Sequence, residues 1–130
     1  MNHLKKLIFY MALPALMLPL IVHANVLDEK LQAYRSMGAA DFSAERGKAL
    51  WISDNSGRSC TQCHGQTPQA VGKHNKTGKA IEPMALSANP KRFTNADKIE
   101  KWFLRNCKWT LERECTPQEK GDVLIWLQGE

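Results

Sequence analysis

Long runs of like charge, strand-like alternation and internal repeats are all missing from this chain of 130 residues. No basic run exceeds two adjacent residues, although 18 Lys and Arg against 13 Asp and Glu give a net charge of +5. The sequence therefore does not indicate a partner nucleic acid. The lack of alternating apolar and polar residues argues against a half-buried sheet. The hydrophobic content of 43% and the charged content of 24% instead suit one small globular domain.

The first 24 residues have the pattern of a secretory signal. Lys5 and Lys6 precede an almost unbroken apolar run at residues 7–22, and Ala24 stands where a signal peptidase cleaves. The alternative is an uncleaved membrane anchor, but 16 apolar residues interrupted by two prolines fall short of the roughly 20 that span a bilayer. We therefore predict a signal peptide at residues 1–24, a mature domain at residues 25–130, and export to the periplasm.

The mature chain is predicted to be helical. Apolar residues at i, i+4 and i+7 predict a helix over residues 26–37, and a second helix begins near Ser43. Capping boxes at residues 94–97 and 116–119 open a third and a last helix. The sequence thus predicts an all-α fold of about four helices.

An irregular segment at residues 53–89 separates the second helix from the third. It is rich in Gly, Ser, Asn, Thr, Pro and Lys and shows no sustained periodicity. An irregular stretch of this length inside a compact domain needs something to wrap around. We therefore expect this segment to surround a bound group.

The sequence Cys-Thr-Gln-Cys-His at residues 60–64 lies inside this segment. The thiols of Cys60 and Cys63 have the spacing at which each adds to one vinyl group of the same haem, and the imidazole of His64 then reaches the iron. The C-x-x-C-H pattern is a covalent haem attachment site. The sequence therefore predicts one haem c, held through Cys60 and Cys63 with His64 as the fifth iron ligand.

Two other uses of this cysteine pair have less support. A redox-active pair of the thioredoxin type is found near a βαβ pattern, which is missing here. A zinc site needs two more close ligands, and Cys107 and Cys115 do not form a second C-x-x-C.

The surroundings of the motif resemble a class I c-type cytochrome. In that fold an N-terminal and a C-terminal helix cross, and a glycine in the first lets the two backbones approach. Gly47 and Trp51 would here meet residues 124–127 of the last helix. The resemblance implies a class I cytochrome c fold around the haem. The alternative is that Gly47 is only a weak point in its helix.

Several side chains compete for the sixth position of the iron. Met84 follows Pro83 in a loop downstream of the haem motif, where an electron-transfer cytochrome of class I places its methionine. Met37 is expected to pack in the core with the first helix. His74 lies in a polar loop and is expected to be solvated.

Asn106 is the fourth competitor. It falls on the same predicted helix face as Ile99, Trp102 and Phe103, where an unpaired amide costs on the order of 1–3 kcal/mol. Two interpretations remain open. Asn106 caps the C-terminus of the helix, or its amide points at the iron.

Cys107 and Cys115 are the only thiols left in an oxidising compartment once Cys60 and Cys63 hold haem. A bond between them closes a loop of about nine residues, worth roughly 2.5 kcal/mol in the chain-entropy model. Two isolated thiols are the alternative.

Asn106 and Cys107, with Cys115 eight residues later, resemble the distal signature of the sphaeroides haem protein family. The resemblance covers about residues 27–128. It includes Ala44-Glu45-Arg46-Gly47, Thr77-Gly78-Lys79, Asn89-Pro90-Lys91-Arg92-Phe93-Thr94, Glu100-Lys101-Trp102 and Arg113-Glu114-Cys115-Thr116-Pro117. Members are small exported c-type cytochromes whose iron is held by histidine and asparagine.

This resemblance implies that His64 is the proximal ligand, that Asn106 is the distal ligand and that Cys107 is bonded to Cys115. It also implies reversible release of the asparagine, binding of oxygen or nitric oxide, and electrons from a dihaem cytochrome c. Membrane contact is expected only through the export signal or a membrane-bound redox partner.

Two functional hypotheses follow. The first is a haem protein that binds small diatomic gases, and possible oxidoreductase activity on oxygen or nitric oxide belongs to it. Its sixth ligand is Asn106, which leaves on reduction. The second is a plain one-electron carrier with His64 and Met84 on the iron.

Overall fold

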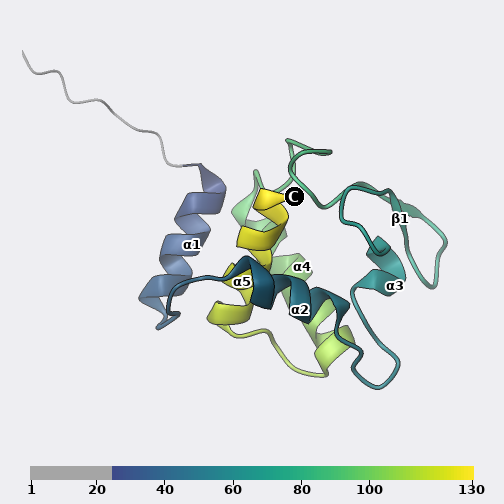
Figure 1. Cartoon of the computed structure of the whole chain (residues 1–130), viewed down its shortest axis with the longest axis horizontal. Coiled ribbons are helices and arrows are strands. Elements are labelled where there is room, and N and C mark those ends of the chain that lie inside the picture. The colour runs from purple at the N-terminus through teal and green to yellow at the C-terminus, as the bar shows by residue number, and fades with distance from the viewer. Residues whose placement is uncertain (1–24) are drawn as a thin grey trace, which may run out of the picture.

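The computed structural model describes residues 25–130, so the predicted signal peptide at residues 1–24 lies outside the described part. The elements in chain order are α1 (Val26–Ser36), α2 (Ala44–Ile52), α3 (Thr61–His64), β1 (Gly72–Lys73), β2 (Ala80–Ile81), α4 (Ala96–Leu111) and α5 (Pro117–Gly129). Figure 1 shows α1, α4 and α2 arranged around α5, with α3 and the strands extending to one side. The prediction of an all-α fold is confirmed. Within residues 25–130 no helix has the length and apolar character needed to cross a membrane.

The helices α2 and α5 cross at Gly47. A Cβ atom at this position would overlap the backbone carbonyl of Asp122, so only glycine permits this approach. One turn later the ring of Trp51 lies 5.3 Å from that of Trp126 in an edge-to-face contact. Together with Val123 and Leu127 these rings form the first of two buried clusters. The predicted crossing of the second and last helices is therefore confirmed.

The buried carboxylate of Asp122 ties the start of α2 to α5. It accepts hydrogen bonds from the Ser43 backbone N–H at 2.7 Å and from Arg46 Nε at 2.8 Å. Gln118, one turn earlier in α5, donates a further bond at 3.0 Å. Burial raises the pKa of Asp122, but these hydrogen bonds outweigh it and hold the pKa below its ordinary value. The carboxylate is thus charged and paired at neutral pH.

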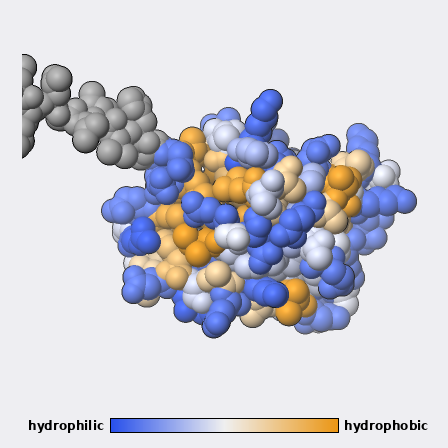
Figure 2. Space-filling model, turned by 45° about the horizontal axis from the view of Figure 1, so that its top comes forward, coloured by the Kyte–Doolittle hydropathy of each residue, from blue (hydrophilic) through white to orange (hydrophobic). Residues whose placement is uncertain are grey.

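The second buried cluster lies between α1, α4 and α5. It consists of Leu27, Leu31, Tyr34, Ile99 and Leu124. Figure 2 shows a hydrophobic area next to the start of the described chain, crossed and surrounded by hydrophilic side chains. This cluster packs α1, α4 and α5 against one another.

The N-terminus of α4 differs from the predicted capping box at residues 94–97. Asn95, and not Thr94, is the N-cap, and its side chain accepts from the Lys98 N–H at 2.8 Å. The Thr94 hydroxyl instead donates to the carbonyl of Lys91 at 3.0 Å. Thr94 and Asn95 can both cap a helix, and in this structure Asn95 does so. The capping box at residues 116–119 is confirmed.

The irregular segment contains a small hairpin that the sequence did not predict. Gly72 pairs with Ile81 and Lys73 with Ala80 in antiparallel register. Two residues in each strand are too few to produce an alternating pattern. Gly78, with φ +69°, supplies the left-handed residue that the connecting turn requires.

Met37 was expected in the core but is 66% exposed. It stands at the C-cap of α1, where the chain turns away through Gly38 with φ +95°. The last turn of the helix therefore leaves this side chain in solvent.

Candidate haem-binding site

The short helix α3 presents the three residues of the attachment motif. Cys60 is its N-cap, and Cys63 and His64 form its last turn before Gly65, whose φ is +77°. Both thiols are free, and all three side chains are half-buried. This is the donor set that haem c requires: two unpaired thiols three positions apart and a neighbouring imidazole.

The hairpin packs directly against this helix. A Cβ at Gly72 would overlap the Cys63 carbonyl oxygen and lie 3.0 Å from the Cα of His64. The N–H of Asn75 donates to Cys63 Sγ at 3.4 Å. The hairpin therefore holds the second thiol in place.

The first thiol lies close to Thr110 of α4. Burial raises the pKa of Cys60 to about 11, and a hydrogen bond with the Thr110 side chain opposes this rise. Thr110 is a buried residue near the end of α4 and four positions after Asn106. One sulfur is thus linked to the hairpin and the other to the helix that carries Asn106.

His64 lies beside Trp51, with 5.0 Å between the two ring centroids. Burial lowers the pKa of His64 to about 4, and the positive charge of Arg92 lowers it further in the same direction. The imidazole is therefore neutral at neutral pH, which is the form that binds a metal. Within residues 25–130 no group of three or more His, Cys, Asp and Glu side chains is arranged around a common metal position.

Met84 is anchored to the loop that follows His64. Its backbone N–H donates to the carbonyl of Pro68 at 2.8 Å, four residues after His64. Its side chain is half-buried and packs against the cluster that contains Trp51 and Trp126. Met84 therefore belongs to the same cluster that contacts the His64 ring.

Asn106 lies inside α4, which continues to Leu111 and ends with Glu112 at φ +58° as its C-cap. The interpretation of Asn106 as a helix cap is therefore wrong. Ile99 is buried on this helix, whereas Asn106 is exposed and Trp102 is 50% exposed. The expected burial of Asn106 among these residues is also not observed. Ile99 and Asn106 lie two turns apart on nearly the same face of α4, and polypeptide covers this face at Ile99 but not at Asn106.

Cys107 and Cys115 are joined by a disulfide, with 5.6 Å between their Cα atoms. Both residues are buried. The bond connects the last turn of α4 to the residue before Thr116, the N-cap of α5. Asn106 thus directly precedes a covalent anchor.

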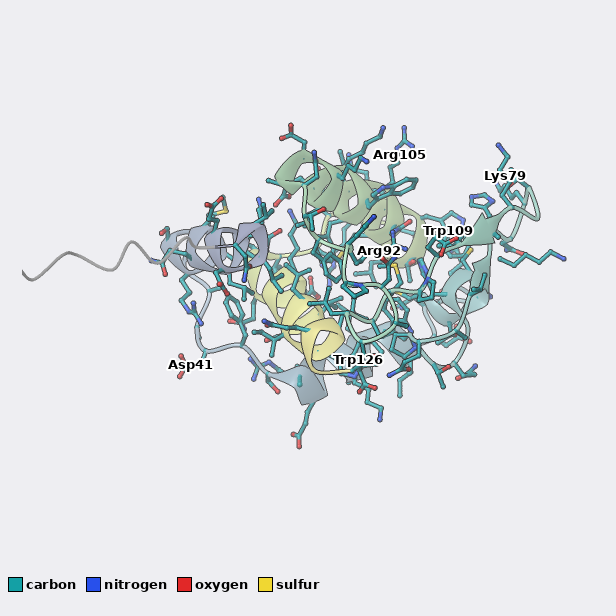
Figure 3. The ribbon with its side chains drawn as sticks, turned by 90° about the horizontal axis from the view of Figure 1, so that it is seen from above. Asp41, Lys79, Arg92, Arg105, Trp109 and Trp126 are labelled. Atoms are coloured by element: carbon teal, nitrogen blue, oxygen red, sulfur yellow. A yellow bond between two sulfur atoms is a disulfide. The ribbon has the colours of Figure 1, made fainter. Side chains whose placement is uncertain are left out.

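His74 is exposed in the hairpin turn, as predicted, and its Nδ1 accepts from the Thr77 N–H at 3.2 Å. The sequence did not predict three contacts at the site: Thr110 with Cys60, Trp51 with His64, and the charge of Arg92 near His64. Each joins residues far apart in the chain, so no local pattern could have revealed it. In Figure 3 Arg92 appears among other side chains near the middle of the view, whereas Lys79 and Arg105 lie at its edge.

Comparison with known proteins gives consistent matches. A family model described as a domain of unknown function (DUF1924) matches residues 37–127. Cytochrome c-type protein SHP from Cereibacter sphaeroides is 43% identical over 105 residues, covering 77% of this chain and 81% of that protein. The solved structure of oxidised SHP, an oxygen-binding cytochrome c, matches with a TM-score of 0.76 at 40% identity. That match covers 83% of this chain and 100% of the other.

A solution structure of cytochrome c'' from Methylophilus methylotrophus, concerned with haem-ligand detachment, is also similar. It matches with a TM-score of 0.67 at 31% identity, over 80% of this chain and 93% of that chain.

Proposed function

Since the chain belongs to the DUF1924 family and to the c-type cytochromes that include SHP, we propose that Asn106 is a displaceable sixth ligand of its haem iron. The chain binds haem c covalently, as these cytochromes do. Reduction releases Asn106, and a small diatomic ligand such as oxygen or nitric oxide takes its place. The proposed attachment residues are Cys60 and Cys63, and the proposed proximal ligand is His64.

The roles of the proximal residues are supported by their chemistry. Cys60 and Cys63 are unpaired thiols fixed from two sides, by α4 and by the hairpin. His64 is neutral and is backed by the Trp51 ring, which limits how far the imidazole can turn. These residues hold the group and set the direction from which the iron is bound.

One observation favours Asn106 over Met84 as the sixth ligand. The Met84 side chain is packed in the cluster that contacts His64, and its backbone is bonded to Pro68. Asn106 is exposed, within a helix, and has no capping role. A sixth ligand would need a side chain free to turn towards the iron, and Met84 would have to leave its cluster to do so.

The haem supplies a one-electron redox centre and a ligand position whose use depends on the axial residues. An amide is a hard, weak donor that softer ferrous iron holds poorly. The Cys107–Cys115 bond, directly after Asn106, would keep any backbone displacement local when the amide leaves. The solved relatives described as oxygen-binding and as showing haem-ligand detachment support this proposal.

Optical spectra with and without carbon monoxide test the proposal. The ferric protein should lack the weak far-red band of methionine coordination, and the ferrous protein should be high-spin and bind carbon monoxide. A ferrous protein that stays low-spin and refuses carbon monoxide would favour the alternative, a one-electron carrier with Met84 on the iron.

Export and electron supply are part of the same proposal. The signal pattern of residues 1–24 supports delivery to the periplasm. Electrons would arrive from a redox partner such as a dihaem cytochrome c. Turnover of oxygen or nitric oxide at the vacated position would make the protein an oxidoreductase.

A further inference from the structure

Arg92 is a half-buried cation that forms no salt bridge, although the charge of Glu82 raises its pKa and so partly opposes the effect of burial. Its Nη2 donates to the carbonyl of Glu82 at 2.6 Å and its Nε to that of Pro83 at 3.1 Å. The salt bridges found within residues 25–130 do not include Arg92. Burial lowers the pKa of the guanidinium, which nevertheless remains charged in proteins. A charge withdrawn from water is costly unless an opposite charge compensates it.

The surrounding backbone holds this charge in position. Phe93, the next residue, has φ +62°, a left-handed conformation that is unusual for a bulky side chain. Its ring packs against both buried clusters. On the other side, the Arg92 N–H donates to the Asn89 carbonyl at 2.9 Å. The guanidinium therefore cannot swing into solvent without losing its two carbonyl partners.

This fixed charge lies near the attachment motif. The carbonyls that Arg92 binds directly precede Met84, whose N–H is bonded to Pro68, four residues after His64. The field of Arg92 also acts on His64. An unpaired guanidinium at this place suits an anionic group bound beside His64.

We propose that Arg92 is the charge partner of a haem propionate. Haem c carries two carboxylates besides the vinyl groups used by Cys60 and Cys63, and an arginine fork matches carboxylate geometry. The pair would bind one edge of the haem to the loop at residues 82–92. The inference rests on covalent haem and not on whether Asn106 or Met84 is the sixth ligand. The assignment of Asn106 can therefore be wrong while the role of Arg92 is right, and the reverse also holds.

The first test replaces the charge and measures the midpoint potential of the holoprotein. Arg92→Gln removes a cation that disfavours the ferric state, so the potential should fall. The ferric-to-ferrous ratio at a fixed potential should rise on the order of three- to tenfold. Lys91→Gln is the matched control, because Lys91 is exposed and adjacent and the charge change is the same. Arg92→Lys should stay close to the parent. Equal potentials for Arg92→Gln and Lys91→Gln would overturn the proposal.

The second test needs no variant and covers the case in which Arg92→Gln does not mature. The propionate resonances of the parent holoprotein are followed by NMR as the pH is lowered. One carboxylate should stay ionised to a lower pH than the other, because the cation favours its charged form. If both propionates titrate together at the ordinary pH for a carboxylic acid, Arg92 only supports its loop.

Discussion

Asn106 and Met84 differ in how firmly the protein holds their side chains. Met84 is surrounded by Trp51, Trp126 and their neighbours, and its N–H is bonded to Pro68. Asn106 lies within α4, and no other side chain of residues 25–130 forms a hydrogen bond with its amide. A ligand that has to leave and return costs the protein least where its side chain has few contacts to break.

At the residue scale we predict opposite results from two substitutions. Asn106→Ala should leave the iron open in both oxidation states, so that the ferric and ferrous forms are both high-spin and bind exogenous ligands. Met84→Leu, which conserves volume, should leave the spectra unchanged and cost less than about 1.5 kcal/mol of stability. Optical spectroscopy and thermal unfolding measure both effects. A Met84→Leu protein with an open iron would contradict the assignment of Asn106.

At the scale of elements, the crossing of α2 and α5 depends on one absent methyl group. Gly47→Ala would force a Cβ onto the carbonyl of Asp122. Overpacking of this kind costs roughly 1–3 kcal/mol, so the variant should unfold at a lower temperature. Gly129→Ala is the matched control, because no atom lies within 4 Å of its added Cβ and it also lies in a helix. Equal stability of the two variants would show that the helices separate without cost.

Glu100 connects three helices. It lies on α4, accepts from Tyr34 of α1 at 2.6 Å and from Lys120 of α5 at 2.8 Å, and also pairs with Lys30 of α1. Burial raises its pKa, but the hydrogen bonds from Lys120, Lys30 and Tyr34 outweigh this and lower the pKa to about 2. The ionised carboxylate is thus the form that stabilises the fold.

The contribution of Glu100 should therefore depend on pH. Because its pKa in the folded chain is below the ordinary 4.5, the stabilisation is present above pH 4.5 and is lost as the pH falls towards about 2. Glu100→Gln should destabilise the neutral protein by on the order of 1 kcal/mol, a modest amount because water reaches part of the carboxylate. The difference from the parent should disappear at acid pH. Urea unfolding over this range measures it, with exposed Glu29→Gln as the control.

The bond between Cys107 and Cys115 joins α4 to the residue before the N-cap of α5. We predict that thiol-specific alkylation of the denatured, unreduced protein labels neither cysteine. Replacing both by Ser should cost about 2–3 kcal/mol, because the bond closes a short loop in the unfolded chain. Labelling of both residues in the parent would contradict the pairing.

At the scale of the whole molecule, the prediction concerns the mature product. Intact mass spectrometry of periplasmic material should give a chain starting at Asn25 plus the mass of one haem. The haem should resist extraction with acidic acetone, because thioether bonds hold it. A Cys60→Ser, Cys63→Ser chain is the control and should lose its haem on extraction. An intact parent mass without haem would contradict the cytochrome assignment.

The local order of residues determined much of this protein. The periodicity of residues 26–37, the cap at Ser43 and the capping box at residues 116–119 each specify a helix through neighbours in the chain, and all are observed. The attachment motif is local in the same way, since Cys60, Cys63 and His64 lie within one turn. A pattern suffices wherever the interacting groups are a few residues apart.

The tertiary structure decided what depends on contacts across the chain. It placed the start of α4 at Asn95 and left Met37 exposed. It also packed Met84 in the cluster beside His64, brought Thr110 to Cys60, and left Arg92 charged and unpaired near His64. Each outcome depends on how segments far apart in the chain, or the chain beyond a helix end, pack against the rest of the fold. Such contacts leave no periodic pattern in the sequence, because packing, and not spacing along the chain, decides which residues meet.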